Sequence, residues 1–181
     1  MQVRKRDGTL EDLNIDKLHK VVMYACEGIA GVSASQVEIN SKIQFFDKID
    51  TEDIQETLIK SAADLISEEA PNYQYVAGRL INYHLRKMVY GQFEPPCLCD
   101  IVQENIDAGF YDSEFTELYT KDEINQLQSY IDHERDEVLT YAAMEQFRGK
   151  YLVQNRATGQ IYETPQVAYM MIAATLFAKY P

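Results

Sequence analysis

Two stretches near the N-terminus repeat apolar residues every three or four positions, and each follows a residue suited to begin a helix. Asn14 precedes the first stretch, and asparagine accepts hydrogen bonds from the N–H groups of a first helical turn. Ser33 precedes the second, and Gln36 stands at the spacing of a capping box. Two amphipathic helices are therefore predicted. Their expected buried residues are Ile15, Leu18, Val21, Val22, Ala25 and Ile29 in the first, and Val37, Ile39, Ile43 and Phe46 in the second.

Two more helices are predicted by the same periodicity. Thr51 is expected to cap the third, because acidic residues follow it at positions where the helix dipole favours them. Pro71 suits the first turn of the fourth helix, and Gly91 suits its end. The expected buried positions are Ile54, Leu58, Ile59, Ala62, Leu65 and Ile66 in the third helix, and Tyr73, Val76, Leu80 and Tyr83 in the fourth.

The segment before the first helix is typical of a β-hairpin. Asp7-Gly8 favours a type I′ turn, because both residues tolerate the positive φ that this turn requires. With a two-residue loop, Arg4 would face Glu11 across the strands. Such a small hairpin buries little apolar surface, so we expect it to lie on the helices as a lid. Residues 45–50 are compatible with a short third strand.

Cationic residues gather where the first helix begins. The first turn of a helix carries partial positive charge, so Lys17 is disfavoured there unless an anion is bound. Lys5 and Arg6 lie on the neighbouring hairpin, and the three cations together suit a phosphate site. Alternatively, they are solvated surface charges that local acids neutralise. Those acids are Glu11, Asp12 and Asp16.

Another cation is unusual for its position on the fourth helix. Lys87 stands where the apolar stripe would continue after Tyr83, which suggests that this face ends against something negative. Alternatively, Lys87 extends into solvent from the last turn, where the helix dipole favours a cation. Spacing alone leaves both interpretations open.

Pro95-Pro96 is the clearest boundary in the chain, because consecutive prolines cannot continue a helix. We therefore predict one unit over residues 1–92 and a second over residues 93–181. In the second unit, residues 165–177 are apolar on nearly every side, which indicates a helix buried in a larger body. Helices are also expected over 97–108, 121–131 and 136–147, and strands over 150–154 and 160–162.

These elements define the expected fold class. It is mainly α, with a four-helix cluster capped by a small β-sheet. A helical segment with one β-hairpin follows.

Composition narrows the function. The chain has 181 residues and a formal net charge of -12, which argues against nucleic acid as the main partner. Neither a secretory signal nor a membrane-spanning run is evident. The chain has 3 cysteines, which form no disulfide framework, so a reduced, cytoplasmic setting is expected.

Two clusters resemble sites of chemistry only superficially. Cys97-x-Cys99 has no second Cys or His pair nearby, so we predict no metal site there. Residues 133–136, His-Glu-Arg-Asp, are interpreted as an ion-pair network at a helix start. No Walker A, GxGxxG, HExxH or GxSxG pattern occurs, and no catalytic residue is predicted.

The N-terminal segment nevertheless points to a family. Residues 3–8, Val-Arg-Lys-Arg-Asp-Gly, followed by residues 14–18, Asn-Ile-Asp-Lys-Leu, resemble the opening signature of the ATP-cone, a regulatory nucleotide-binding module. The chain also resembles, over its whole length, the large subunit of class I aerobic ribonucleoside-diphosphate reductase. The segments that carry this wider resemblance are 70–77, 90–96, 150–155 and 158–163.

The resemblance implies an allosteric activity site at which ATP activates the enzyme and dATP inhibits it, with Mg2+ as a possible companion and no prosthetic group. Glu11 and Asn14 would lie near the base, whereas Lys17 and Lys87 would contact phosphates. Arg6 would contact the nucleotide or a partner subunit. Gln55 replaces a histidine that relatives can carry. The implied nucleotide contacts are Lys5, Glu11, Asp12, Leu13, Asn14, Ile15, Asp16, Lys17, Thr51 and Lys87.

The resemblance also implies partners: the remainder of the large subunit and the radical-carrying small subunit, in an oligomer that makes deoxyribonucleotides for DNA replication. The resemblance further implies that the helical segment is the start of a larger α/β barrel protein. The catalytic barrel is not among these 181 residues, so we expect no ribonucleotide reduction by this chain alone. Two alternatives remain. One is a cone-type transcriptional regulator, which would need four N-terminal zinc ligands and a basic face. The other is a helical interaction module without a ligand.

Overall fold

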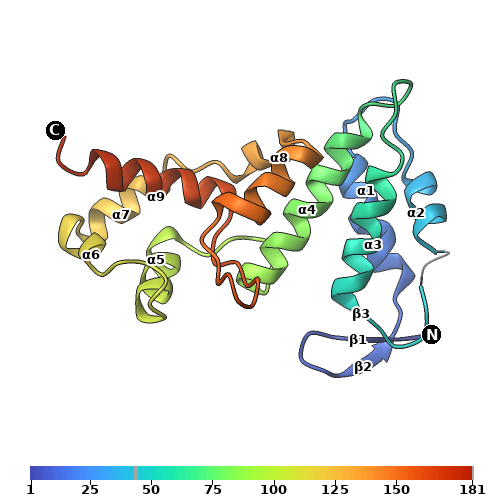
Figure 1. Ribbon diagram of the computed structural model, residues 1–181, viewed down its shortest axis with the longest axis horizontal. Helices are drawn as coiled ribbons and strands as arrows, with labels where there is room; N and C mark the ends of the chain where they lie inside the picture. Colours follow the sequence, from blue (N-terminus) through green and yellow to red (C-terminus); the bar gives the residue numbers. More distant parts are fainter. Residues whose placement is uncertain (43–44, 181) are drawn as a thin grey trace. The chain divides into compact units, whose positions relative to one another are not determined.

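The computed structural model describes residues 1–42 and 45–180, and most of them are helical (Figure 1). The chain divides into two compact units. The first contains Met1–His84 and Glu137–Glu145, and the second contains Leu85–Asp136 and Gln146–Pro181. The mainly helical fold with a small sheet is the predicted fold class.

The sheet of the first unit has three short strands, and their order in the sheet differs from their order along the chain. Strand β1 (Gln2–Arg4) lies between β2 (Leu10–Asp12), its antiparallel neighbour, and β3 (Ile49–Asp50), its parallel neighbour. Strand β3 confirms the third strand expected within residues 45–50. Val3 and Ile49 are buried beneath the sheet together with Ile54, so the lid is anchored by a small apolar cluster.

The hairpin has a longer loop than predicted. Arg4 pairs with Leu10 and Val3 with Glu11, so Arg4 does not face Glu11. The Gly8 N–H donates to the Lys5 carbonyl at 2.9 Å, and Gly8 adopts a φ of +83°. This is a three-residue loop, a type I turn followed by a left-handed glycine, which shifts the register by one residue. The prediction of a two-residue type I′ turn was wrong.

Four helices complete the first unit: α1 (Ile15–Cys26), α2 (Ala34–Lys42), α3 (Thr51–Ala63) and α4 (Tyr73–Tyr90), whose last turns belong to the second unit. Their core confirms most of the predicted apolar stripes. The fully or almost fully buried residues include Val22, Ala25, Val37, Ile54, Leu58, Ile59, Ala62, Tyr73, Val76 and Leu80.

Four predicted core residues are instead exposed. Ile66, which follows the end of α3, is 37% exposed. Ile15 is 57% exposed, Ile39 61% and Phe46 60%. On α2 the buried positions are Val37 and Ser41, four residues apart, and Ile39 lies on the opposite side of the helix. Ile15 belongs to the first turn of α1, beside the lid. Ile43 lies outside the described residues.

The helix caps also differ from the prediction. Asp50, not Thr51, is the N-cap of α3, and Thr51 is its first helical residue. Pro71 lies in a turn two residues before α4 begins. At the start of α2, Gln36 does not reach back to Ser33; the Tyr73 hydroxyl accepts from the Ser33 N–H at 2.9 Å and donates to the Gln36 Oε1 at 2.6 Å. A tyrosine 37 residues away therefore completes the cap.

Replacing Tyr73 with phenylalanine is expected to lower the free energy of unfolding by about 1 to 2 kcal/mol, since the Ser33 N–H and the Gln36 Oε1 both lose their hydrogen bond to the hydroxyl of a buried tyrosine. Tyr75→Phe on the same helix is the matched control, because Tyr75 has no hydrogen bond to another described side chain. Denaturant unfolding of the two variants measures the difference. Equal losses would contradict a capping role for Tyr73.

The second unit is built from α5 (Leu98–Asp107), α6 (Glu114–Leu118), α7 (Lys121–Gln128) and α9 (Pro165–Phe177) around Leu98, Ile101, Val102, Phe115, Ile124 and Val167. Helices α5 and α7 confirm two predicted helices with shorter bounds. Thr120 and Glu123 form a capping box at α7. Helix α6 was not predicted.

The structure differs from the prediction at residues 136–147 and at the two predicted strands. A 3-10 helix (His133–Val138), helix α8 (Tyr141–Gln146) and a π-helix (Phe147–Tyr151) follow one another, so residues 136–147 are not one α-helix. In the described region, residues 150–154 and 160–162 contribute a single antiparallel bridge between Gln154 and Ile161. The ladder goes no further at Val153 because its N–H donates to the Glu163 carboxylate at 2.8 Å.

Helix α9 is apolar all round, as predicted, yet much of it is exposed within this chain. Tyr169, Ile172, Leu176 and Phe177 are each more than half exposed. Within the described residues, no helix is both long enough and apolar enough to cross a membrane. Exposed apolar residues on this scale are typical of an interface.

The exposed face of α9 should make the isolated chain self-associate. Replacing Ile172 and Leu176 together with glutamate is expected to reduce this association, because both side chains are exposed and their loss leaves the core intact. Sedimentation velocity across a concentration series measures it. Ile39→Glu, at an equally exposed apolar residue on α2, is the control, and an equal reduction there would contradict a role for α9.

Candidate functional site

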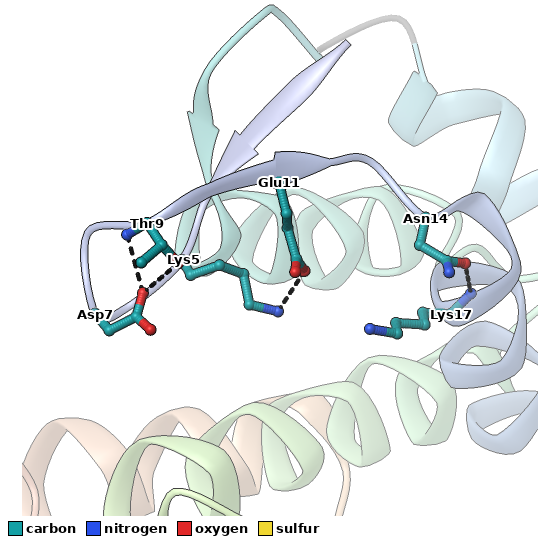
Figure 2. A network of polar contacts seen from close by, with 6 residues as sticks. All are labelled: Lys5, Asp7, Thr9, Glu11, Asn14 and Lys17. Carbon is teal, nitrogen blue, oxygen red and sulfur yellow. Dashed lines mark hydrogen bonds and ion pairs between the residues drawn. The ribbon is translucent and has the colours of Figure 1, made fainter.

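The site that the sequence predicted begins at a rigid hairpin loop. The Asp7 carboxylate accepts hydrogen bonds from the Thr9 N–H at 2.9 Å and from the Thr9 hydroxyl at 2.7 Å (Figure 2). The hydroxyl contact, followed by the N–H contact, holds the pKa of Asp7 below its usual value. The backbone closes the loop as well, since the Lys5 N–H donates to the Thr9 carbonyl at 2.8 Å. The loop therefore fixes where Lys5 leaves the strand.

Two lysines approach one carboxylate on the face of the hairpin. The Lys5 Nζ lies 2.8 Å from the Glu11 Oε1, across the diagonal of the β1–β2 ladder. The side chain of Lys17 extends toward the same carboxylate from the start of α1 (Figure 2). The hydrogen bond and charge of Lys5 hold the pKa of Glu11 below its usual value, and the charge of Lys17 adds a smaller effect. The group is cationic overall, with two ammonium groups and one carboxylate.

Helix α1 begins at this cluster as predicted. Asn14 is its N-cap in an extended conformation, and the Asn14 Oδ1 accepts from the Lys17 N–H at 3.0 Å (Figure 2). The other N–H groups of the first turn add partial positive charge. Lys17 is exposed, and its Nζ makes no hydrogen bond or ion pair with any residue that the structure describes. An ammonium without a partner in a positive first turn is the arrangement expected for binding an anion.

The lid is also attached to the start of α3. The Arg6 Nε lies 3.1 Å from the Glu52 Oε1, and the Arg4 Nη1 lies 3.5 Å from the Asp50 Oδ1. The alternative that local acids neutralise the hairpin cations holds for Lys5, which pairs with Glu11. Arg6 pairs with an acid 46 residues away, a contact that sequence spacing alone did not indicate.

The other predicted contacts are distributed over several elements. Asp12 and Asp16 are exposed on β2 and in the first turn of α1. Leu13 and Ile15 line an apolar cavity of about 270 Å³ together with Leu18. All three positions lie close to Asn14 in the chain.

Thr51 and Lys87 complete the set. Thr51 opens α3 between Asp50 and Glu52, the two acids that hold the lid. Lys87 is half-buried in the last turn of α4 and belongs to the second unit, whereas the other predicted contacts belong to the first. The described residues contain no cluster of three or more side chains suited to hold a metal ion.

Comparison with known proteins identifies the module. A model of the ATP cone domain matches residues 1–88, which hold the hairpin, the start of α1, Thr51 and Lys87. Residues 1–88 are an ATP cone domain. The cone therefore carries every residue predicted to contact the nucleotide.

The whole chain is similar to a longer protein. It is 55% identical over 179 residues to the ribonucleoside-diphosphate reductase 1 subunit alpha of Escherichia coli (strain K12), a match that covers 99% of this chain and 24% of that protein. It is 51% identical over 181 residues to the subunit alpha of Haemophilus influenzae, covering 24% of it, and 42% identical over 181 residues to that of Enterobacteria phage T4, also covering 24%. The chain thus corresponds to the N-terminal region of class I alpha subunits and spans about a quarter of their length.

Proposed function

We propose that the cone binds ATP or dATP and that the bound nucleotide regulates ribonucleotide reduction by the large subunit of a ribonucleoside-diphosphate reductase. The observation that carries this proposal is the ammonium of Lys17, which stands without a partner among the described residues at the positive start of α1. The family match of residues 1–88 supports a nucleotide as the anion. Charge-assisted hydrogen bonds to phosphate oxygens are stronger than neutral ones.

The chain supplies suitable groups for each part of the nucleotide. Lys17 would donate to phosphate oxygens, and Lys5 would add charge at the edge of the lid. Glu11 and Asn14 offer acceptors for the amino group of adenine, while Leu13 and Ile15 offer apolar surface for its ring. Asp12, Asp16 and Thr51 border this region, and a magnesium ion bound to the phosphates would offset the local acids.

Lys87 stays a proposed phosphate ligand. Its place in the last turn of α4 also fits the alternative that it interacts with the carbonyl end of the helix dipole. Binding measurements on a Lys87 variant separate the two interpretations, because the dipole contact involves no nucleotide.

The wider function is proposed from similarity to the alpha subunits. In that proposal, the remainder of the large subunit carries the reductase activity, the radical-carrying small subunit is a partner, and the state of the cone alters how the subunits assemble. Residues 1–92 would form the regulatory domain and 93–181 the segment leading to the catalytic barrel. This domain division and the cytoplasmic setting stay predictions.

Saturating nucleotide should stabilise the chain against heat. At a concentration of ATP one hundred times its Kd, the gain is expected to be about 2.7 kcal/mol, because ligand that binds only the folded state shifts the unfolding equilibrium. Differential scanning calorimetry with ATP, dATP or adenosine measures the gain. Adenosine lacks phosphates and should stabilise far less. A gain from adenosine equal to that from ATP would contradict a phosphate site, and no gain from any of the three would favour the interaction module without a ligand.

A further inference from the structure

Residues 137–145, here called the strap, belong to the first unit although the chain on both sides of them belongs to the second. The strap contains Leu139 and most of α8. It lies against α4 at very short range, because a Cβ placed on Gly78 would come 2.1 Å from the Leu139 carbonyl oxygen. The strap is thus packed directly on α4, the last helix of the cone.

A single arginine joins the strap to helix α1. Arg79, the residue after Gly78, donates from its Nη1 to the Glu27 carbonyl at 2.6 Å and from its Nε to the Glu137 carbonyl at 3.2 Å. Glu27 is the C-cap of α1, so one half of this guanidinium caps the end of the helix and the other half holds the first residue of the strap. The planar guanidinium suits this task because it fixes the direction of both donors.

A second contact joins the same two elements through side chains. The Tyr24 hydroxyl, in the last turn of α1, donates to the Glu137 Oε1 at 2.6 Å, and this pair is partly buried. The charge on the carboxylate makes this hydrogen bond stronger than a neutral one. Glu137 is therefore held at its backbone by Arg79 and at its side chain by Tyr24.

Helix α1 has the proposed nucleotide site at one end and the strap at the other. Asn14 and Lys17 form its first turn, whereas Tyr24 and Glu27 end it. A helix of this length measures about 18 Å and moves as a stiff rod, so a tilt at one end displaces the carbonyls at the other. Displacement of the Glu27 carbonyl changes the geometry at Arg79, and Arg79 also holds the strap.

We propose that the Arg79–Glu137 contact is a latch through which occupancy of the nucleotide site controls whether the strap stays docked on the cone. This inference rests on the proposed nucleotide function. Nucleotide bound at the start of α1 favours the docked strap, and release of the strap loosens residues 136 and 146, which lead directly into the second unit. Arg79 and Glu137 are positioning residues, since neither is among the proposed nucleotide contacts.

Linkage makes this proposal quantitative. If nucleotide binds the docked state more tightly by some factor, then nucleotide must favour docking by the same factor, and opening of the strap must weaken nucleotide binding by up to that factor. Coupling between two sites is typically about five- to 150-fold, so a change of about fivefold or more is expected in each measurement. Two independent experiments must therefore agree.

The first experiment is amide hydrogen exchange of the 181-residue chain with and without saturating ATP. Exchange within residues 137–145 is expected to slow by about fivefold or more when ATP is bound. In Arg79→Lys, which keeps the charge but loses the two fixed donors, the strap should exchange rapidly with ATP and without it. Arg156→Lys is the matched control, since Arg156 donates from its Nη2 to the Lys150 carbonyl at 3.2 Å in the second unit.

The second experiment is calorimetric titration of the same variants with ATP. Arg79→Lys should weaken ATP binding by the factor measured in the exchange experiment, Tyr24→Phe by a smaller factor, and Arg156→Lys not at all. Circular dichroism confirms that each variant is folded. Wild-type chain that binds ATP with no change in strap exchange overturns the latch and leaves the nucleotide site intact. A chain that binds no ATP overturns the nucleotide function on which the latch rests.

Discussion

Replacing Lys17 with alanine is expected to weaken ATP binding by about one to two orders of magnitude. The Lys17 ammonium extends over the lid face toward the Glu11 carboxylate, and it has no partner among the described residues that would compete with a phosphate (Figure 2). A hydrogen bond to a charged group contributes about 1.5 to 3 kcal/mol, and each 1.4 kcal/mol is tenfold in affinity. Isothermal titration calorimetry of the two proteins at equal ionic strength measures the loss.

Lys20→Ala is the matched control for this prediction. Lys20 is an exposed lysine on the same helix, one turn beyond Lys17, so its removal changes the net charge equally. Only a screened, long-range effect is expected from it. Equal losses from the two substitutions would show a diffuse cationic field in place of a site. Adenosine binding should be weak and nearly unaffected by either substitution.

Lys87→Ala tests the residue that the structure assigns to the other unit. If Lys87 contacts phosphate, its removal should weaken ATP binding by a factor similar to that for Lys17. If instead it interacts with the carbonyl end of α4, the Kd for ATP should stay unchanged and stability should fall by about 0.3 to 1 kcal/mol. The two outcomes exclude each other.

The sequence predicted most of the first unit because its signals are local. Asn14 caps α1 through its own third neighbour, and the stripes of α3 and α4 follow from a period of about 3.6 residues. These features depend on residues a few positions apart, so they are visible in the chain itself. The phosphate site at Lys17 is proposed from equally local signals and stays a prediction.

The errors share a different cause, which is contact between distant residues. Tyr73 replaces the predicted capping box at Ser33, and Asp50 meets Arg4 across the sheet, so the start of α3 moves by one residue. Periodicity carries no information about such partners. The hairpin error is local but subtle, since Asp-Gly serves both a two-residue type I′ loop and a three-residue loop with a left-handed glycine.

The second unit was harder to predict because polar side chains replace regular backbone pairing there. Glu163 is 3% exposed and accepts from the Val153 N–H and from the Tyr111 hydroxyl. A stretch of alternating apolar and polar residues that ends in such a contact has the sequence pattern of a β-strand. It lacks the row of backbone hydrogen bonds to a neighbouring strand. Buried acids of this kind also set the pH dependence of the unit.

Asp136 is the most completely buried of these acids, with no exposed surface, and its substitution by asparagine should stabilise the chain more as pH rises. Burial raises the pKa of Asp136 to about 6, while a hydrogen bond from the Gln166 amide and the nearby charge of Arg86 oppose that rise. In the unfolded chain this carboxyl has the usual pKa near 3.8. The folded state therefore holds the proton more tightly, so the charged form opposes folding.

The sign and size of the effect follow from proton linkage. A folded-state pKa above the unfolded value favours folding at low pH, and that stability is lost as pH rises from about 4 through about 6. The full effect corresponds to about 3 kcal/mol, reached near pH 7. An asparagine side chain would keep an acceptor for the Gln166 amide but would carry no charge at any pH. The Asp136→Asn variant should therefore resemble wild type near pH 4 and be more stable by up to that amount at pH 8.

Urea unfolding of wild type, Asp136→Asn and Asp132→Asn at pH 4.5 and pH 8 distinguishes burial of charge from a general effect of removing an acid. Asp132 is the matched control, since its side chain is 48% exposed and pairs with Arg135 at 3.4 Å. Surface pairs of that kind contribute about 0 to 1 kcal/mol, so Asp132→Asn should show little gain at either pH. A gain for Asp136→Asn that is equal at both pH values would contradict the burial argument. A loss at pH 8 would mean that attraction between Asp136 and the buried Arg86 outweighs desolvation.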